Sequence, residues 1–161
     1  MLKKIVFYTK VGCKLLKKDV INKEEYKKEY NKVAKTYSHW LAEMGKFTEK
    51  IIKPEYILKE HKPKILDFAC GTGYITKSLL EKNIHYEITA VDISDKMLEQ
   101  LKNLNDARVK VVNCDGIKFL KNTEEKYDII FFGWALSYFN YKELFKLFKR
   151  VLNHDGIVGI I

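Results

Sequence analysis

The chain has 161 residues, and 47% of them are hydrophobic, which is enough for one sizeable core. Thirty basic residues against twenty-one acidic residues give a net charge of +9. The three cysteines are Cys13, Cys70 and Cys114, and their number and spacing fit neither a zinc motif nor a disulfide framework. We therefore predict no metal site and a reducing, cytoplasmic location.

The positive charge lies mainly in the first part of the chain. Residues 1–63 contain sixteen lysines and eight acids, whereas residues 64–161 are almost balanced. Such a segment can contact RNA phosphates. Arg108 and Arg150 are the only arginines, however, so the bidentate phosphate contacts that arginine offers are scarce. A solvated lysine surface is the stronger interpretation, and nucleic-acid binding is the weaker one.

The N-terminal part of the chain is expected to be helical. Its first apolar run is interrupted at Lys10, too early for a signal peptide or a membrane span. A helix is predicted from Asn22, a capping residue, to about residue 43, with Gly45 ending it. Its apolar face has helical spacing and consists of Tyr26, Tyr30, Val33, Ala34, Tyr37, Trp40 and Leu41. A second helix over about 46–60, interrupted at Pro54, completes a predicted cover segment of residues 1–63.

A strand, a glycine turn and a helix follow in direct succession. The strand is residues 64–68, the turn is Gly71-Thr-Gly73 and the helix is residues 73–82. This arrangement is typical of α/β proteins that bind a nucleotide-like ligand, because the glycines let the backbone approach it closely. Asp92 ends the next strand, residues 86–92, where its carboxylate can accept hydrogen bonds from the two hydroxyls of a ribose.

The rest of the chain continues the alternation of strands and helices. We predict a helix over 94–104, strands over 108–113 and 127–132, a helix over 141–152 and a strand over 156–161. This order is typical of a parallel sheet flanked by helices. Asp92 and Asp115 each precede a predicted helix start, so helix capping is an alternative role for both.

The glycine turn also indicates which nucleotide is bound. A dinucleotide fingerprint requires a third glycine where this chain has Thr76. The pattern Asp67-x-Ala69-x-Gly71-x-Gly73 instead resembles motif I of the class I S-adenosylmethionine-dependent methyltransferases, with Ala69 in place of the first glycine. Tyr30-Asn-Lys-Val-Ala-Lys-Thr-Tyr37 resembles the segment before motif I in small-molecule enzymes of the menaquinone/ubiquinone methyltransferase type, with Asn31 in place of the usual Asp.

The resemblance implies a role for each matching position. Asp92 would hold the ribose, Ile93 would pack on adenine and an acid such as Asp115 would bond the adenine amino group. Gly133 and Trp134 would face the methyl group, and Tyr37 would either border the site as part of a lid or simply cover the sheet. The full set implied to bind S-adenosylmethionine is Tyr37, Asp67, Ala69, Gly71, Gly73, Asp92, Ile93, Met97, Asp115, Gly116, Gly133 and Trp134.

The resemblance also implies a fold. It is an α/β, Rossmann-like core over residues 64–161, with strand order 3-2-1-4-5, an N-terminal helical lid and five of the family's seven strands. We therefore expect a chain truncated after the fifth strand. Residues 156–161 are too apolar for a bare sheet edge, so we expect C-terminal strands, a partner chain or self-association to cover them.

The implied activity is methyl transfer from S-adenosylmethionine to a small-molecule acceptor. The alternatives are an RNA or protein methyltransferase that uses the basic segment, and a non-catalytic cofactor-binding domain. No catalytic base is predicted, because Ser137-Tyr138 stands where related enzymes often carry His-His. Trp134, Tyr138 and Phe139 would line an acceptor pocket or, in the favoured interpretation, belong to core and cover.

Overall fold

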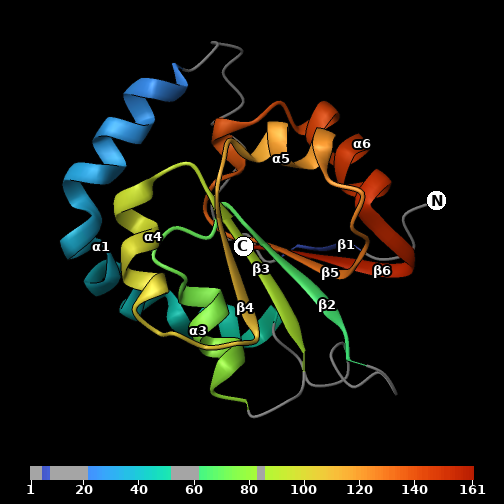
Figure 1. The fold of residues 1–161 in the computed structure, drawn as a ribbon, viewed down its shortest axis with the longest axis horizontal. Coiled ribbons are helices and arrows are strands. Elements are labelled where there is room, and N and C mark those ends of the chain that lie inside the picture. Colours follow the sequence, from blue (N-terminus) through green and yellow to red (C-terminus); the bar gives the residue numbers. More distant parts are fainter. Residues whose placement is uncertain (1–4, 8–21, 52–61, 83–85) are drawn as a thin grey trace.

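Six parallel strands form one sheet with helices on both of its faces (Figure 1). The computed structural model describes residues 5–7, 22–51, 62–82 and 86–161, with side chains over 22–37, 62–82 and 86–161. The sheet order is β1-β6-β5-β2-β3-β4. In chain order the strands are β1 Ile5–Phe7, β2 Lys64–Phe68, β3 Glu87–Asp92, β4 Val109–Asn113, β5 Tyr127–Phe132 and β6 Leu152–Ile160.

The helices divide between the two faces of the sheet. One face carries α3 (Tyr74–Leu80) and α4 (Asp95–Lys102), with α1 (Lys23–Ile51) in contact with both of them. The other face carries α5 (Gly116–Asn122) and α6 (Tyr141–Val151), which contact each other. A short 3-10 helix, η1 (Leu136–Tyr138), follows β5.

The core follows the alternation of side chains along each strand. In β2, Leu66 and Phe68 pack on the face of α5 and α6, together with Phe148. Ile65 points to the opposite face and packs with Leu79 of α3. Central strands are therefore apolar on both sides, as parallel sheets require.

The strand order agrees with the expected order 3-2-1-4-5, which here is β4-β3-β2-β5-β6. β2 pairs with β3 on one side and with β5 on the other. Chain connections therefore diverge at the carboxyl end of β2, which is where α/β sheets bind ligands. Asp92, Phe68 and Phe132 end the three strands that meet there.

Several elements differ from the sequence prediction. α1 does not end near Gly45 but continues to Ile51, because a glycine inside a helix costs only about 1 kcal/mol and does not by itself stop it. α5 is the short helix implied by the capping alternative for Asp115, whereas β1 and η1 were not predicted. β6 begins directly after α6 at Leu152 rather than at residue 156. The second helix was predicted over about 46–60; residues 46–51 belong to α1, and residues 52–60 lie outside the described residues. In the described ranges, no helix has the length and hydropathy needed to cross a bilayer.

The strand β6 is not a free edge. The N-terminal strand β1 pairs with it in parallel, with Ile5, Val6 and Phe7 opposite Val158, Gly159 and Ile160. This pairing agrees with the prediction that the edge is covered, but the neighbour comes from the start of the same chain, and the expected C-terminal strands, partner chain or self-association stay predictions. The predicted division at residues 63 and 64 stays a prediction, although a strand from the first segment joins the sheet of the second.

Candidate functional site

The turn after β2 has an unusual backbone. Ala69, Gly71 and Gly73 all adopt positive φ angles, of 56°, 54° and 76°. Alanine in this left-handed region costs roughly 1 kcal/mol, a strain that is found mainly at functional sites. The turn is tied to the neighbouring strand by a hydrogen bond from the Cys70 N–H to the Val91 carbonyl, 3.0 Å long.

Asp92 holds this turn from the end of β3. Its Oδ2 accepts a 2.8 Å hydrogen bond from the Gly71 N–H, and its Oδ1 accepts a 2.8 Å bond from the Ser94 N–H. Burial raises the pKa of Asp92, and the bonds from Ser94 and Gly71 act in the opposite direction. A carboxylate has about four lone-pair positions, so Asp92 can still accept hydrogen bonds from a ligand.

A cleft of about 850 Å³, which includes solvent at its mouth, lies over the carboxyl ends of the strands. It is lined by strand ends and loops from β2 to β5 and by side chains of α1. Its lining consists of Lys23, Tyr26, Tyr30, Tyr37, Ala69, Gly71, Val91, Asp92, Ile93, Met97, Asp115, Gly116, Gly133, Trp134, Ala135, Tyr138 and Phe139.

Tyrosines of α1 form the roof of the cleft. The Tyr30 hydroxyl donates a 2.8 Å hydrogen bond to the Tyr138 hydroxyl of η1. Tyr26 packs edge-on against Tyr138 at 4.5 Å between ring centroids, and Tyr37 packs edge-on against Tyr30 at 5.7 Å. Burial raises the pKa of Tyr30 and of Tyr37 above the ordinary value, so both phenols stay protonated at neutral pH.

Asp115 performs the capping role that we considered for it and also faces the cleft. Its Oδ1 accepts a 2.8 Å bond from the Lys118 N–H at the start of α5, and its Oδ2 lies 2.7 Å from Lys23 Nζ. Burial alone would raise the pKa of Asp115, but these two partners outweigh it and hold the pKa below its ordinary value. For Asp92, the following helix is capped instead by Ser94.

Ten of the twelve predicted site residues line this cleft, and Asp67 and Gly73 do not. Gly73 caps α3, and a Cβ on it would lie 2.3 Å from Leu101 Cδ1, so its role in the structure is close packing against α4. Trp134 lines the cleft at the end of β5 and has a positive φ of 51°. Its backbone N–H donates a hydrogen bond to the Ile161 carbonyl.

Asp67 is buried next to the cleft. Its Oδ2 accepts bonds from the Thr76 N–H at 3.1 Å and the Thr76 hydroxyl at 2.6 Å. Its Oδ1 has no hydrogen-bond partner among the described residues. Burial raises the pKa of Asp67 to about 7. Asp67 borders a smaller adjoining cavity that shares Tyr37, Gly71 and Trp134 with the main cleft.

Several residues that line the cleft were not in the set of site residues predicted from the sequence. Tyr26 and Tyr30 lie on the helical face that was identified, and their spacing from Tyr37 was the available indication. Tyr138 and Phe139 line the cleft, although core and cover was the favoured interpretation. Lys23 had no distinguishing signal, because it is one of many lysines in that segment.

The residues of the cleft fit S-adenosylmethionine. The ligand carries a ribose, an adenine and an amino acid, and the cleft provides carboxylates at Asp92 and Asp115 and a backbone turn free of large side chains at Gly71. The unpartnered oxygen of Asp67 beside the turn suits a cationic ammonium group.

Comparisons with known proteins agree with this arrangement. Residues 65–156 match the family described as "Methyltransferase domain". The chain is 32% identical over 136 residues to the malonyl-[acyl-carrier protein] O-methyltransferase of Priestia megaterium, covering 82% of this chain and 49% of that protein. It is 32% identical over 109 residues to the demethylmenaquinone methyltransferase of Thermotoga maritima, covering 66% of this chain and 46% of that protein.

The fold has solved counterparts. The plantazolicin methyltransferase BpumL, in complex with SAH, superposes with a TM-score of 0.66 at 19% identity, covering 84% of this chain and 58% of that one. The chain spans about half the length of the curated relatives that it matches. The family match, the strand order and the glycine turn agree, and the chain therefore belongs to the methyltransferase-domain family, in the class I S-adenosylmethionine-dependent group.

Proposed function

We propose that this chain transfers a methyl group from S-adenosylmethionine to a small-molecule acceptor bound beneath the tyrosines of α1. The observation that carries the proposal is the roof itself. Tyr30 of α1 and Tyr138 of η1 meet through their hydroxyl groups across the cleft, so the space below is bounded by aromatic rings. Such an enclosure suits a compact acceptor better than a polymer.

In this proposal the cofactor is held by residues at the strand ends. Asp92 receives the ribose hydroxyls while it continues to fix the Gly71 turn, and Ile93 and Met97 provide apolar contact for the adenine. Asp115 accepts from the adenine amino group, and Asp67 faces the ammonium group from the adjoining cavity. Bound there, the cofactor supplies an electrophilic methyl group on a sulfonium ion.

The chain's own contribution to the reaction is alignment and exclusion of water. The charged side chains lining the cleft are Lys23, Asp92 and Asp115, and each has a partner in the structure. Among the described residues the acceptor end thus offers phenol hydroxyls and aromatic faces and no general base. Holding a nucleophile in line with the methyl group can supply most of the acceleration.

The nature of the relatives' acceptors supports a small molecule or a carrier-bound one. The matched relatives are named for malonyl-[acyl-carrier protein] and demethylmenaquinone. RNA is a less suitable acceptor, because three lysines of α1 are already paired with carboxylates. The pairs, each within 4.0 Å, are Lys23 with Asp115, Lys27 with Asp95 and Lys32 with Glu29.

The test is formation of S-adenosylhomocysteine by the chain with a panel of carboxylic acids, quinols and a malonyl-carrier protein, and with RNA in parallel. We expect turnover with a member of the first group, and a loss of it in Tyr30→Phe/Tyr138→Phe, which keeps the rings and removes the paired hydroxyls. Turnover with RNA alone, falling steeply as salt is raised, would replace the proposal with the nucleic-acid alternative.

A further inference from the structure

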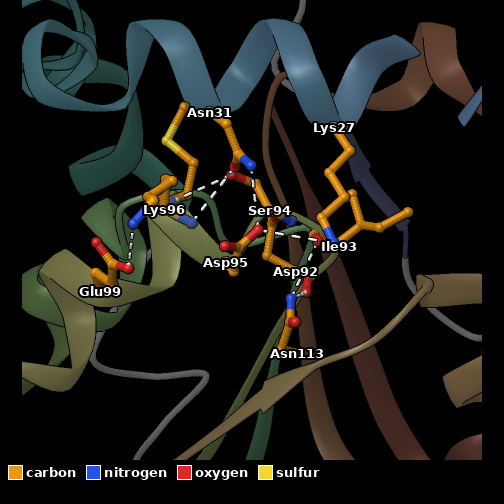
Figure 2. Close-up of polar contacts among 10 residues, drawn as sticks. Lys27, Asn31, Asp92, Ile93, Ser94, Asp95, Lys96, Glu99 and Asn113 are labelled. Carbon is orange, nitrogen blue, oxygen red and sulfur yellow. Dashed lines mark hydrogen bonds and ion pairs between the residues drawn. The ribbon is translucent and has the colours of Figure 1, made fainter. Parts of the chain in front are cut away.

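Asn31 attaches the roof of the cleft to its floor (Figure 2). We call residues 23–37 of α1 the roof segment. Asn31 Oδ1 accepts a 2.5 Å hydrogen bond from the Ser94 hydroxyl and lies 3.4 Å from the Lys96 N–H. Asn31 Nδ2 donates a 3.1 Å bond to Asp95 Oδ1. One amide thus uses both its donor and its acceptor at the start of α4.

Ser94 connects this amide to the cofactor site. Its hydroxyl caps α4 by accepting from the Met97 N–H at 3.2 Å, and its own N–H donates to Asp92 Oδ1. The other oxygen of Asp92 holds the Gly71 N–H. A continuous line of hydrogen bonds therefore runs from Asn31 through Ser94 and Asp92 to the glycine turn. Ser94 is fully buried, so water cannot replace these bonds easily.

Ion pairs alone do not explain how the roof segment is held. Lys27 lies 3.6 Å from Asp95, and Lys23 lies 2.7 Å from Asp115, but these lysines are partly or largely exposed. Exposed pairs contribute little. The Gln100 side chain also donates to the Ala34 carbonyl of the roof segment. Asn31 is half-buried and lies between these contacts along α1. Of the roof-segment contacts named here, its hydrogen bond is the one made with the buried Ser94.

The amide is suited to its position by its chemistry. An aspartate at position 31, which is the residue in the resembled sequence pattern, could accept from Ser94 but could not donate to Asp95. It would instead place two carboxylates within hydrogen-bonding distance of each other. Exchanging the two residues, with aspartate at 31 and asparagine at 95, would restore one donor and one acceptor.

We propose that Asn31 is a positioning residue for cofactor binding, which couples docking of the roof segment to the orientation of Asp92. The inference rests on the proposed function in that the cleft receives the S-adenosyl group. Tyr26, Tyr30 and Tyr37 line the cleft only when the roof segment is docked. If the docked fraction falls, the apparent affinity for the ligand falls by the same factor.

The experiment compares Asn31→Ala, Asn31→Asp, Asp95→Asn and the double variant Asn31→Asp/Asp95→Asn. Lys32→Ala is the matched control, because Lys32 is the next residue, is exposed and pairs within α1 with Glu29. Two quantities are measured: affinity for S-adenosylhomocysteine by calorimetry, and hydrogen exchange of residues 23–37 without and with that ligand. Alanine favours helix more than asparagine does, so faster exchange in Asn31→Ala cannot come from helix propensity.

We expect Asn31→Ala to bind S-adenosylhomocysteine about tenfold more weakly, equivalent to about 1.4 kcal/mol, and to exchange faster over residues 23–37 in the free protein. Asn31→Asp should bind more weakly still. The affinity of the double variant for S-adenosylhomocysteine should recover to within about threefold of that of Asp95→Asn. A role of Asn31 in general stability would not produce this recovery. Lys32→Ala should behave as the unmodified chain.

Unchanged exchange and affinity in Asn31→Ala would overturn the inference, and so would a double variant no better than Asn31→Asp. Failure of the unmodified chain to bind S-adenosylhomocysteine would count against the proposed function instead. Exchange of the free protein would still report whether Asn31 docks the roof segment. If Asn31→Ala does not fold, the comparison of the double variant with Asp95→Asn decides.

Discussion

At the scale of single residues, Asp67 shows how burial sets the charge of a group. Its carboxyl group is buried beside Thr76, and burial raises its pKa to about 7. In the unfolded chain it would titrate near 4. Between these values the native state holds a proton that the unfolded state has lost. The contribution of Asp67 to stability is therefore most favourable at low pH and declines until the pH passes about 7.

Asp67→Asn should remove this pH dependence. As the pH rises from 4 to 8, the unmodified chain loses the contribution of Asp67 and the variant does not. The free energy of unfolding of the variant minus that of the unmodified chain should therefore rise by on the order of 2–4 kcal/mol over this range. Urea unfolding of both proteins at several pH values measures the difference. A difference that stays constant with pH would show that Asp67 is ionised in the folded chain. Thr76→Val is a useful control, because it removes a hydrogen-bond donor and leaves the carboxyl group in place.

Asp92 has a structural role as well as the predicted cofactor role. Loss of its side chain should therefore weaken cofactor binding and also destabilise the fold. The structure predicts both effects, because Asp92→Ala leaves the N–H groups of Gly71 and Ser94 without their acceptor. We expect about 1–3 kcal/mol lost from stability and roughly 2–4 kcal/mol from binding of S-adenosylhomocysteine.

Thermal unfolding and calorimetry of the Asp92→Ala variant measure the two losses separately. Asp92→Asn, which keeps one oxygen, should lie between the variant and the unmodified chain in both measurements. An unchanged melting temperature with a large loss of affinity would mean that the backbone bonds to Asp92 contribute nothing.

At the scale of elements, local patterns predicted most of the strands and the site at their ends. β2, β3 and β5 agree with the sequence to within a residue, because buried parallel strands are short apolar runs with clear limits. The ends of these strands bring Asp92 and the glycine turn together. Asp67 shares a face with Ile65, so it points to α3 and not into the main cleft, which the motif by itself did not indicate.

What local patterns could not provide were contacts between distant elements. Tyr30 and Tyr138 are separated by 108 positions, and only the docked α1 brings their hydroxyls together. The continuation of α1 past Gly45 was missed because one glycine is a weak stop. The role of Gly73 depends on Leu101 of another helix, which a motif cannot show.

Gly73 offers a test of how α3 and α4 pack. Gly73→Ala forces a side chain into a φ of 76° and places Cβ 2.3 Å from Leu101 Cδ1. We expect a loss of about 2–5 kcal/mol of stability, from backbone strain of about 1–2 kcal/mol and overpacking of about 1–3 kcal/mol. The double variant Gly73→Ala/Leu101→Ala, compared with Leu101→Ala alone, isolates the backbone strain, and the remainder of the loss in Gly73→Ala is the overpacking against Leu101. If the loss is the same in both backgrounds, the strain is entirely in the backbone.

At the scale of the whole molecule, the sheet is completed by its own N-terminal strand. β1 has three residues and pairs with a strand near the other end of the chain, so no local pattern indicates it. The apolar character of β6 did indicate that a neighbour was needed. Pairing with β1 gives the N-terminal residues a part in the stability of the sheet and in its protection from self-association.

Replacing Val6 and Phe7 together by proline should expose β6. Successive backbone N–H groups in a strand point to opposite edges, so the N–H of either Val6 or Phe7 points toward β6. Replacing both residues therefore removes a donor that faces β6. We expect a loss of about 1–3 kcal/mol of stability and more self-association, measured by denaturant unfolding and light scattering. A stable, monodisperse double variant would show that β6 tolerates exposure or that β1 is dispensable.

The central claim is that the cleft at the carboxyl ends of β2, β3 and β5 binds an S-adenosyl ligand and not a dinucleotide. The most direct measurement is isothermal titration calorimetry of the chain with S-adenosylhomocysteine and, in parallel, with NAD. The account predicts binding of the first at one site per chain, weakened in Asp92→Asn, and no heat of binding with the second. Binding of NAD without binding of S-adenosylhomocysteine would contradict it.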